Sequence, residues 1–79
     1  MFSMFGIRTI VPEKLIKARG EKTRREIVER GGGKFSEQDL YNWEKGLNLP
    51  RPEKQLFLLR GLNVHFEEIS EEISLDMVV

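Results

Sequence analysis

The feature that most constrains this chain is a run of three glycines, residues 31–33, between two helix-start signals. Three consecutive glycines cannot sustain a helix, because glycine loses more backbone entropy on folding than any other residue. Upstream, Thr23 and Glu26 have the spacing of a capping box, in which a hydroxyl and a carboxylate satisfy free backbone amides. Downstream, Ser36 and Asp39 repeat that spacing with Asp in place of the usual Glu. The sequence therefore predicts two short helices joined by a glycine turn.

Prolines and further glycines predict additional helices on either side of this pair. Pro12 and Pro52 suit the first position of a helix, because the amide hydrogen that proline lacks would be unpaired there. Gly20 and Gly46 end their segments, and Gly61 and Asn63 mark the end of the segment that Pro52 opens. A fifth, short and acidic helix is expected to begin at Val64 and to extend toward Ile73. All five predicted segments are short, so their stability must come from packing.

The length of 79 residues supports one small domain, and a hydrophobic content of 39% allows a modest core. Leu40 and Trp43 are three residues apart and share one helix face, so we expect both in the core. At this size a single core rarely supplies more than about 3–5 kcal/mol, which makes a partner chain a reasonable expectation.

The net charge of zero hides a division along the chain. Residues 1–34 hold nine Lys/Arg and four Asp/Glu, whereas residues 35–79 hold four Lys/Arg and nine Asp/Glu. Such a division suggests that one half faces a polyanion and that the acidic half faces a protein partner. Two ordinary solvated surfaces explain the same numbers, and charge alone leaves both interpretations open.

Several classes of catalytic and metal site are absent from the sequence. There is no cysteine, so neither a disulfide framework nor a thiolate metal site can form, and a reducing cytoplasm is the natural compartment. His65 is the only histidine, and it precedes an acidic segment in a helix N-cap position. Lys34 follows the glycines, but Phe35 stands where a phosphate-binding loop needs Ser or Thr. We therefore expect no enzyme, no cofactor and no metal.

The ends of the chain are separated from the predicted domain, which covers residues 11–74. Residues 1–10 are assigned to an N-terminal arm that is expected to be flexible, although an added strand or an appended non-native segment would fit the same residues. Residues 75–79 alternate weakly as a strand does, and a frayed terminus is favoured over pairing with the arm or a second subunit. No stretch approaches the roughly 20 apolar residues that a membrane helix requires.

The two helices around the glycine turn form the arrangement of a helix-turn-helix. In such a unit the second helix lies in the major groove of DNA and the first crosses the backbone. The second helix then needs an apolar inner face, which Leu40 and Trp43 supply. Its polar outer face would consist of Glu37, Gln38, Tyr41, Asn42 and Lys45.

At this point the chain resembles the Cro/C1-type (XRE) helix-turn-helix family. The matching elements are Leu15 and Arg19, Thr23–Glu29, Phe35–Ser36, Leu40, Trp43–Gly46, Leu49–Pro50, Leu56 and Leu59, and Gly61–Ile69. The resemblance implies an all-α, compact five-helix bundle of the lambda-repressor-like type, with short extended termini allowed. It also implies a sequence-specific, double-stranded DNA-binding regulator of transcription that acts as a homodimer.

The resemblance also assigns roles to single residues. Glu37, Gln38 and Asn42 take positions that reach base edges, and Tyr41 lies on the same outer face. The resemblance places Arg24, Ser36 and Arg51 against the DNA backbone, and the cations Arg25, Lys34 and Lys45 are also expected to contact it because of their charge. Chemistry supports part of this assignment, because glutamine and asparagine can make paired hydrogen bonds with adenine and arginines neutralise phosphates.

Two features depart from the family pattern. The glycine turn is about two residues longer than the usual turn of this motif, and Glu37 and Asp39 place two negative charges at the front of the reading helix. Both acids favour the helix dipole but repel phosphate. A protein-interaction module on the same fold, such as an antitoxin-like or adaptor protein, is therefore the alternative function.

Overall fold

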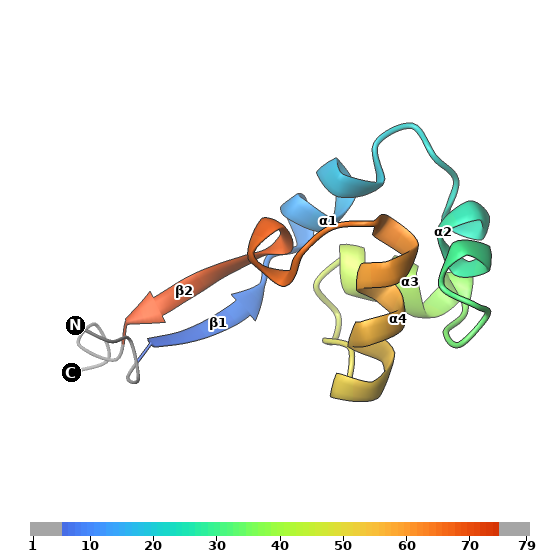
Figure 1. The fold of residues 1–79 in the computed structure, drawn as a ribbon. Coiled ribbons are helices and arrows are strands. Elements are labelled where there is room, and N and C mark those ends of the chain that lie inside the picture. The colour runs from blue at the N-terminus through green and yellow to red at the C-terminus, as the bar shows by residue number, and fades with distance from the viewer. Residues whose placement is uncertain (1–5, 75–79) are drawn as a thin grey trace.

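The computed structural model describes residues 6–74 (Figure 1). Its elements in chain order are β1 (Gly6–Ile10), α1 (Pro12–Arg19), α2 (Arg24–Arg30), α3 (Glu37–Glu44), α4 (Pro52–Leu62), the 3-10 helix η1 (Phe66–Ile69) and β2 (Ser70–Ser74). β1 occupies residues 6–10 of the predicted N-terminal arm. Residues 1–5 and the tail 75–79, for which the sequence raised strand pairing, lie outside the described residues.

The prediction of an all-α five-helix bundle is wrong. Within residues 6–74, four α-helices are combined with a two-stranded antiparallel sheet in which Gly6 pairs with Ser74 and Ile10 pairs with Ser70. The expected fifth helix is reduced to the 3-10 turn η1, where Glu68 accepts a hydrogen bond from the His65 amide at 2.8 Å. Residues beyond η1 pair with β1 instead, because a strand partner from the other end of the chain satisfies their backbone groups.

The predicted starts of the first four helices are confirmed, and α4 continues through Gly61 to Leu62, with Asn63 as its C-cap residue. Pro12 and Pro52 each stand at the first helical position of α1 and α4. Complete capping boxes start α2 and α3, with Thr23 and Ser36 as the N-cap residues. The turn between α2 and α3 uses Gly32 and Gly33, both at positive φ, a conformation that costs glycine little.

The hydrophobic core lies between the helices and extends to the start of the sheet. Its buried residues are Ile10, Leu15, Ile27, Phe35, Leu40, Trp43, Leu58, Leu62 and Ile69. Leu40 and Trp43 are both buried, as predicted, and the Trp43 ring lies 5.4 Å from the ring of Phe35. α3 therefore turns its apolar side inward and its amide-bearing side toward solvent.

Two glycines allow α2 and α4 to approach closely. A Cβ atom added at Gly61 would collide with the backbone oxygen of Ile27, and one added at Gly31 would lie 2.7 Å from the backbone oxygen of Phe57. Such separations are far inside van der Waals contact, so side chains at these positions would force the helices apart. The position of α2, and through it the turn into α3, depends on this contact.

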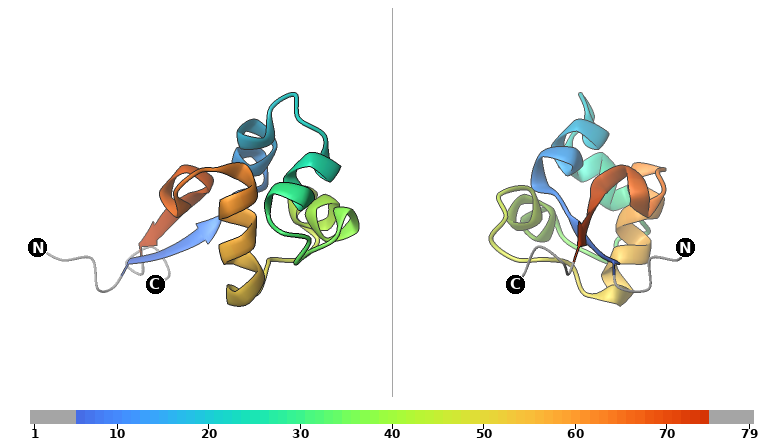
Figure 2. Two further views of the ribbon diagram at one scale, coloured as in Figure 1. Left: turned by 45° about the vertical axis from the view of Figure 1, so that its right-hand side comes forward. Right: turned by 90° about the vertical axis from the view of Figure 1, so that its left-hand side faces the viewer.

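The β1–β2 ribbon, which consists of the two paired strands, extends from one side of the helical body (Figures 1 and 2). Within residues 6–74 these are the two strands of a single sheet, and each is bonded to the other alone. Among these residues no helix has the length and apolar character that crossing a membrane demands.

Candidate nucleic-acid interface

The amino end of α3 is held by its own cap and by α4. Ser36 Oγ accepts from the Asp39 amide at 2.9 Å, and Asp39 Oδ2 accepts from the Ser36 amide at 3.0 Å. Lys54 of α4 donates to the same Asp39 oxygen at 3.0 Å. The hydrogen bond from the Ser36 backbone, followed by that from Lys54, lowers the pKa of Asp39 below its usual value. Asp39 is thus engaged in a cap and an ion pair, which reduces the repulsion it would exert on an approaching phosphate.

Two amide side chains one helical turn apart are joined on the solvent side of α3. Gln38 is exposed and its Nε2 donates to Oδ1 of half-buried Asn42 at 3.0 Å. Since Asn42 Oδ1 accepts one hydrogen of the Gln38 amide, the second hydrogen and Oε1 of Gln38 remain for other partners. This donor and acceptor pair matches the N7 and N6 groups of adenine in the major groove. Glu37, at the start of the same helix, is exposed as well.

Tyr41 lies between two cations on the same side of the molecule. Its side chain is 39% exposed, and its ring centre is 5.1 Å from the Arg24 guanidinium carbon and 5.5 Å from Lys45 Nζ. Cations at such distances are attracted by the ring face. The structure therefore brings together Arg24 from α2, Tyr41 from α3 and Lys45 from the end of α3.

A buried carboxylate fixes the position of Arg24. Glu44 is 3% exposed and accepts from Arg24 Nη2 at 3.0 Å and from Arg19 Nε at 2.7 Å. The hydrogen bond to Glu44 raises the pKa of Arg19, against the lowering effect of burial. Two guanidinium groups share one carboxylate, so the cluster keeps one positive charge, and the Arg24 side chain remains 32% exposed.

Sequence reasoning gave no role to Arg19 and Glu44, which the structure joins to Arg24. Both were noted as parts of a motif, and neither received a role. No local signal marked Glu44 as buried, because glutamate is almost never fully buried unless it is paired. A buried acid needs a cationic partner, and Arg24 begins the preceding helix.

The other residues predicted to contact the DNA backbone are exposed, and in the described part of the chain they do not interact with Arg24, Tyr41 or Lys45. Arg25 pairs with Glu29 one turn along α2 at 3.4 Å. Lys34 is exposed in the glycine turn, and Arg51 is exposed as the N-cap residue of α4. Within residues 6–74 no hydrogen bond or ion pair joins these three cations to Arg24, Tyr41 or Lys45. Ser36 uses its hydroxyl in the cap.

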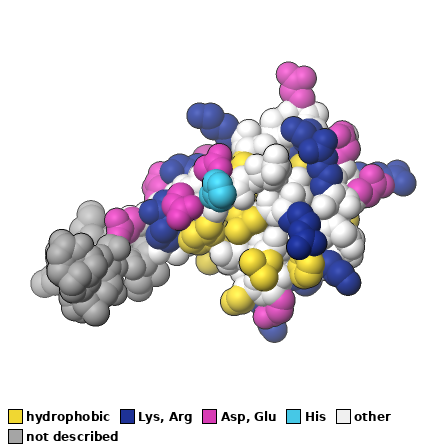
Figure 3. Space-filling view, in the orientation of Figure 1, with side chains coloured by type: hydrophobic (Ala, Val, Ile, Leu, Met, Phe, Trp, Pro, Cys, Tyr) yellow, Lys and Arg dark blue, Asp and Glu magenta, His cyan; other side chains and the backbone are white. Residues whose placement is uncertain are grey.

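The division of charge along the sequence does not produce two separate surfaces. Lys14 of the basic half pairs with Glu71 of the acidic half at 3.4 Å, and Arg8 donates to the Ser70 and Glu67 carbonyls. Figure 3 shows Lys/Arg and Asp/Glu side chains interspersed over the visible face. The fold mixes the two halves because the last strand pairs with the first.

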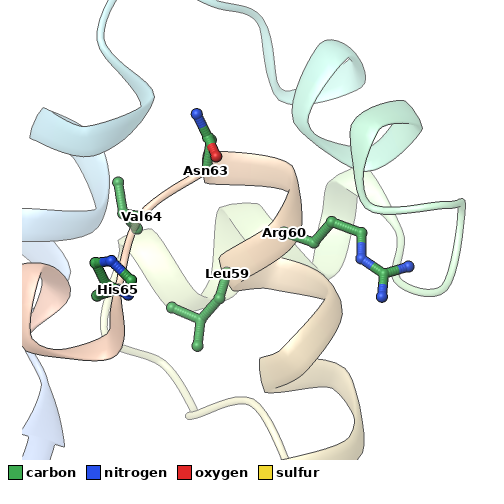
Figure 4. Close-up of a pocket in the computed structure, with 5 residues that line it drawn as sticks. All are labelled: Leu59, Arg60, Asn63, Val64 and His65. Atoms are coloured by element: carbon green, nitrogen blue, oxygen red, sulfur yellow. The ribbon is translucent and has the colours of Figure 1, made fainter.

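The polar side chains around one surface hollow do not converge on a common point. This hollow of about 270 Å³ lies at the carboxyl end of α4, lined by Leu59, Arg60, Asn63, Val64 and His65 (Figure 4). In this view the Arg60 guanidinium points away from His65 and Asn63. Polar groups that do not converge cannot orient a small molecule. Within residues 6–74, no group of three His, Asp or Glu side chains is arranged to hold a metal ion.

Comparisons with protein-family models, with curated proteins and with solved structures found no match to this chain. The resemblance to the Cro/C1-type family therefore stays a prediction that rests on the sequence elements described above.

Proposed function

We propose that this chain is a sequence-specific, double-stranded DNA-binding regulator of transcription of the Cro/C1 type. α3 enters the major groove, with Gln38 directed at a base edge, and α2 lies against the phosphate backbone. A cytoplasmic location and a two-fold dimer on a palindromic site belong to the same proposal. The chain acts by binding and needs neither a cofactor nor a catalytic residue.

The observation that carries the proposal is the composition of one continuous surface. The hydrogen-bonded pair Gln38 and Asn42 lies on the same helix as Tyr41, whose ring is flanked by Arg24 and Lys45. Amides that can read bases and cations that can neutralise phosphates are the two components that specific DNA recognition combines. Trp43 and Leu40 on the opposite side of α3 are buried, so the helix has one side free for a duplex.

Selection of bound sequences from random duplexes tests the proposal, followed by equilibrium binding over a series of salt concentrations. We expect one preferred motif and an affinity that falls steeply as salt rises, because bound phosphates release counterions. If no duplex binds even at low salt, the proposal fails.

A protein-interaction module is the second candidate, and one observation favours it. In the loop after α3, Leu47 is 68% exposed and Leu49 is 56% exposed. Exposed leucines after the carboxyl end of α3, together with the exposed acid Glu37 at its amino end, would suit a protein partner better than a phosphate backbone. Failure of every duplex in the selection, together with saturable binding of a protein partner, would favour this alternative.

A further inference from the structure

We infer that the outer edge of β1 pairs with the β1 strand of a second copy of this chain, which produces a four-stranded antiparallel sheet across a two-fold axis. This inference concerns the β1–β2 ribbon and does not require DNA to bind. It specifies the interface of the two-fold dimer in the proposed function and rests on that part of it, whereas base reading by α3 is tested separately by the duplex selection.

The ribbon is incomplete as a sheet. A two-stranded ribbon is marginally stable in water, and a third strand or a packed face is needed for independent stability. The β1–β2 ribbon extends from the helical body (Figure 1), and Ile73 within it is 44% exposed. Unpaired edges are templates for another strand. The question is which of the two edges is open.

The register identifies the backbone groups that face outward. The Val11 amide donates to the Ile69 carbonyl at 2.9 Å, and these residues continue the ribbon register by one pair. Hydrogen-bonded and non-hydrogen-bonded pairs alternate along antiparallel strands. The next pair, Ile10 with Ser70, is therefore non-hydrogen-bonded. By this alternation the outward N–H and C=O groups of β1 belong to Gly6, Arg8 and Ile10.

The outer edge of β2 is occupied and acidic. The Ser70 carbonyl on this edge accepts from Arg8 Nη2 at 3.1 Å and from Lys14 Nζ at 3.2 Å. Glu71 and Glu72 follow, both exposed. Two copies that paired through this edge would bring like charges face to face, which is destabilising. Charged edge residues are a common protection against strand pairing.

Among the described residues, the outer edge of β1 is neither occupied by side-chain donors nor lined by acidic residues. Its one charged residue, Arg8, extends its guanidinium across to β2, where it donates to Ser70 Oγ at 2.9 Å and to the Glu67 carbonyl at 3.3 Å. The positive charge is thereby drawn away from the β1 edge. Within residues 6–74 no hydrogen bond links the outward backbone groups of Arg8 or Ile10 to another group.

The outward groups of β1 lie symmetrically about Arg8, so the same edge of a second copy can satisfy all of them. Gly6 and Ile10 are equidistant from Arg8 along β1. Two antiparallel β1 strands therefore pair Arg8 with Arg8 and Gly6 with Ile10, and this pairing closes on itself as a two-fold interface does. The adjoining segments 1–5 and 75–79 are mainly apolar in sequence, and they continue from Gly6 and Ser74, which are paired at one end of the ribbon.

Proline substitution distinguishes the two edges, because it removes one backbone donor and is tolerated on an edge strand. Arg8→Pro deletes an outward amide of β1, and Glu72→Pro deletes the equivalent amide of β2. In sedimentation velocity over a concentration series we expect dimers for the wild type and for Glu72→Pro, and monomers for Arg8→Pro. Arg8→Ala, which keeps the amide, is expected to remain dimeric. A monomeric wild type, or a dimeric Arg8→Pro protein, overturns the inference.

A cross-linking experiment decides the question if a proline variant fails to fold. The sequence has no cysteine, so Arg8→Cys and Glu72→Cys each introduce a single thiol. Residue 8 faces its own copy across the two-fold axis, at a separation that a disulfide can span. We expect mild oxidation to give covalent dimers of Arg8→Cys much faster than of Glu72→Cys. Equal rates, or faster cross-linking through residue 72, contradict pairing through β1.

Discussion

The guanidinium of Arg24 on α2 lies 3.0 Å from the carboxylate of Glu44 on α3, and that carboxylate is almost completely buried. Arg19 of α1 reaches the other oxygen of Glu44 at 2.7 Å. One acid therefore connects the first three helices. Because Arg24 also contacts the Tyr41 ring, the same acid positions a cation on the surface proposed to face DNA.

Glu44→Gln is expected to destabilise the fold by about 1–3 kcal/mol, since it leaves guanidinium donors without a charged acceptor. The cost stays below that of a fully buried ion pair because the arginine side chains are 17% and 32% exposed and can be rehydrated. Urea unfolding measures the change. Glu37→Gln, at an exposed position of the same helix, is the matched control and should change stability by less than about 0.5 kcal/mol. Equal effects of the two substitutions would contradict a structural role for Glu44.

The pH dependence of stability is expected to include a contribution from Asp39. Its pKa is lowered in the folded state by the Ser36 backbone amide and by Lys54. A lowered folded pKa means that the stabilisation is fully present above the unfolded value of about 3.9 and is lost as pH falls through the folded value. The stability difference between the wild type and Asp39→Asn should therefore shrink on acidification below about pH 4.

Thermal unfolding of both proteins across the acid range measures this difference, and Glu37→Gln again serves as the control. A gap between wild type and Asp39→Asn that stays constant from neutral pH to strong acid would contradict the cap and ion pair at Asp39.

The helix boundaries were predictable from the sequence because their signals are local. Thr23 and Glu26 are three residues apart, as are Ser36 and Asp39, and each pair caps a helix without help from the rest of the chain. The β1–β2 ribbon was not predictable in this way. Its pairs join residues as distant as Gly6 and Ser74, and the acidic segment before Ile73 has no strand pattern of its own.

Gly61→Ala is expected to destabilise the protein by about 1–3 kcal/mol, because the new methyl group collides with the Ile27 backbone where α4 crosses α2. In an open helix the same substitution would stabilise by up to about 1 kcal/mol. Chemical denaturation measures the change in the free energy of unfolding, and its sign distinguishes the two cases. Arg60→Ala, at the exposed neighbouring position, is the control and should have little effect. A stabilised Gly61→Ala protein would show that α2 and α4 are farther apart.

The candidate interface was predictable only in part. The outward side of α3 follows from the spacing of Leu40 and Trp43, so Gln38 and Tyr41 were identified without coordinates. The pairing of Arg24 with Glu44 joins residues 20 positions apart, and no local pattern connects them. The spatial mixing of charge, as between Lys14 and Glu71, likewise depends on tertiary pairing.

Arg24→Ala is expected to weaken binding of all duplexes by a similar factor and to reduce the salt dependence of the affinity by about one counterion. The reason is that Arg24 would contact a phosphate and carry no base information. Binding isotherms at several salt concentrations measure both effects. Arg30→Ala removes an equal charge from the exposed end of α2, outside the predicted contacts, and should change the salt slope less. Equal slopes for the two variants would contradict the phosphate role of Arg24.

Gln38→Ala is expected to relax base preference at one position of the selected motif, at a cost of about 1–3 kcal/mol for the preferred sequence. Asn42→Ala should relax preference at that same position, because Asn42 Oδ1 holds the Gln38 amide at 3.0 Å. An independent reading role for Asn42 would instead change a different base pair. Selection from random duplexes with each variant separates these outcomes. Unchanged preference in Gln38→Ala, with overall affinity retained, would remove Gln38 from the reading surface.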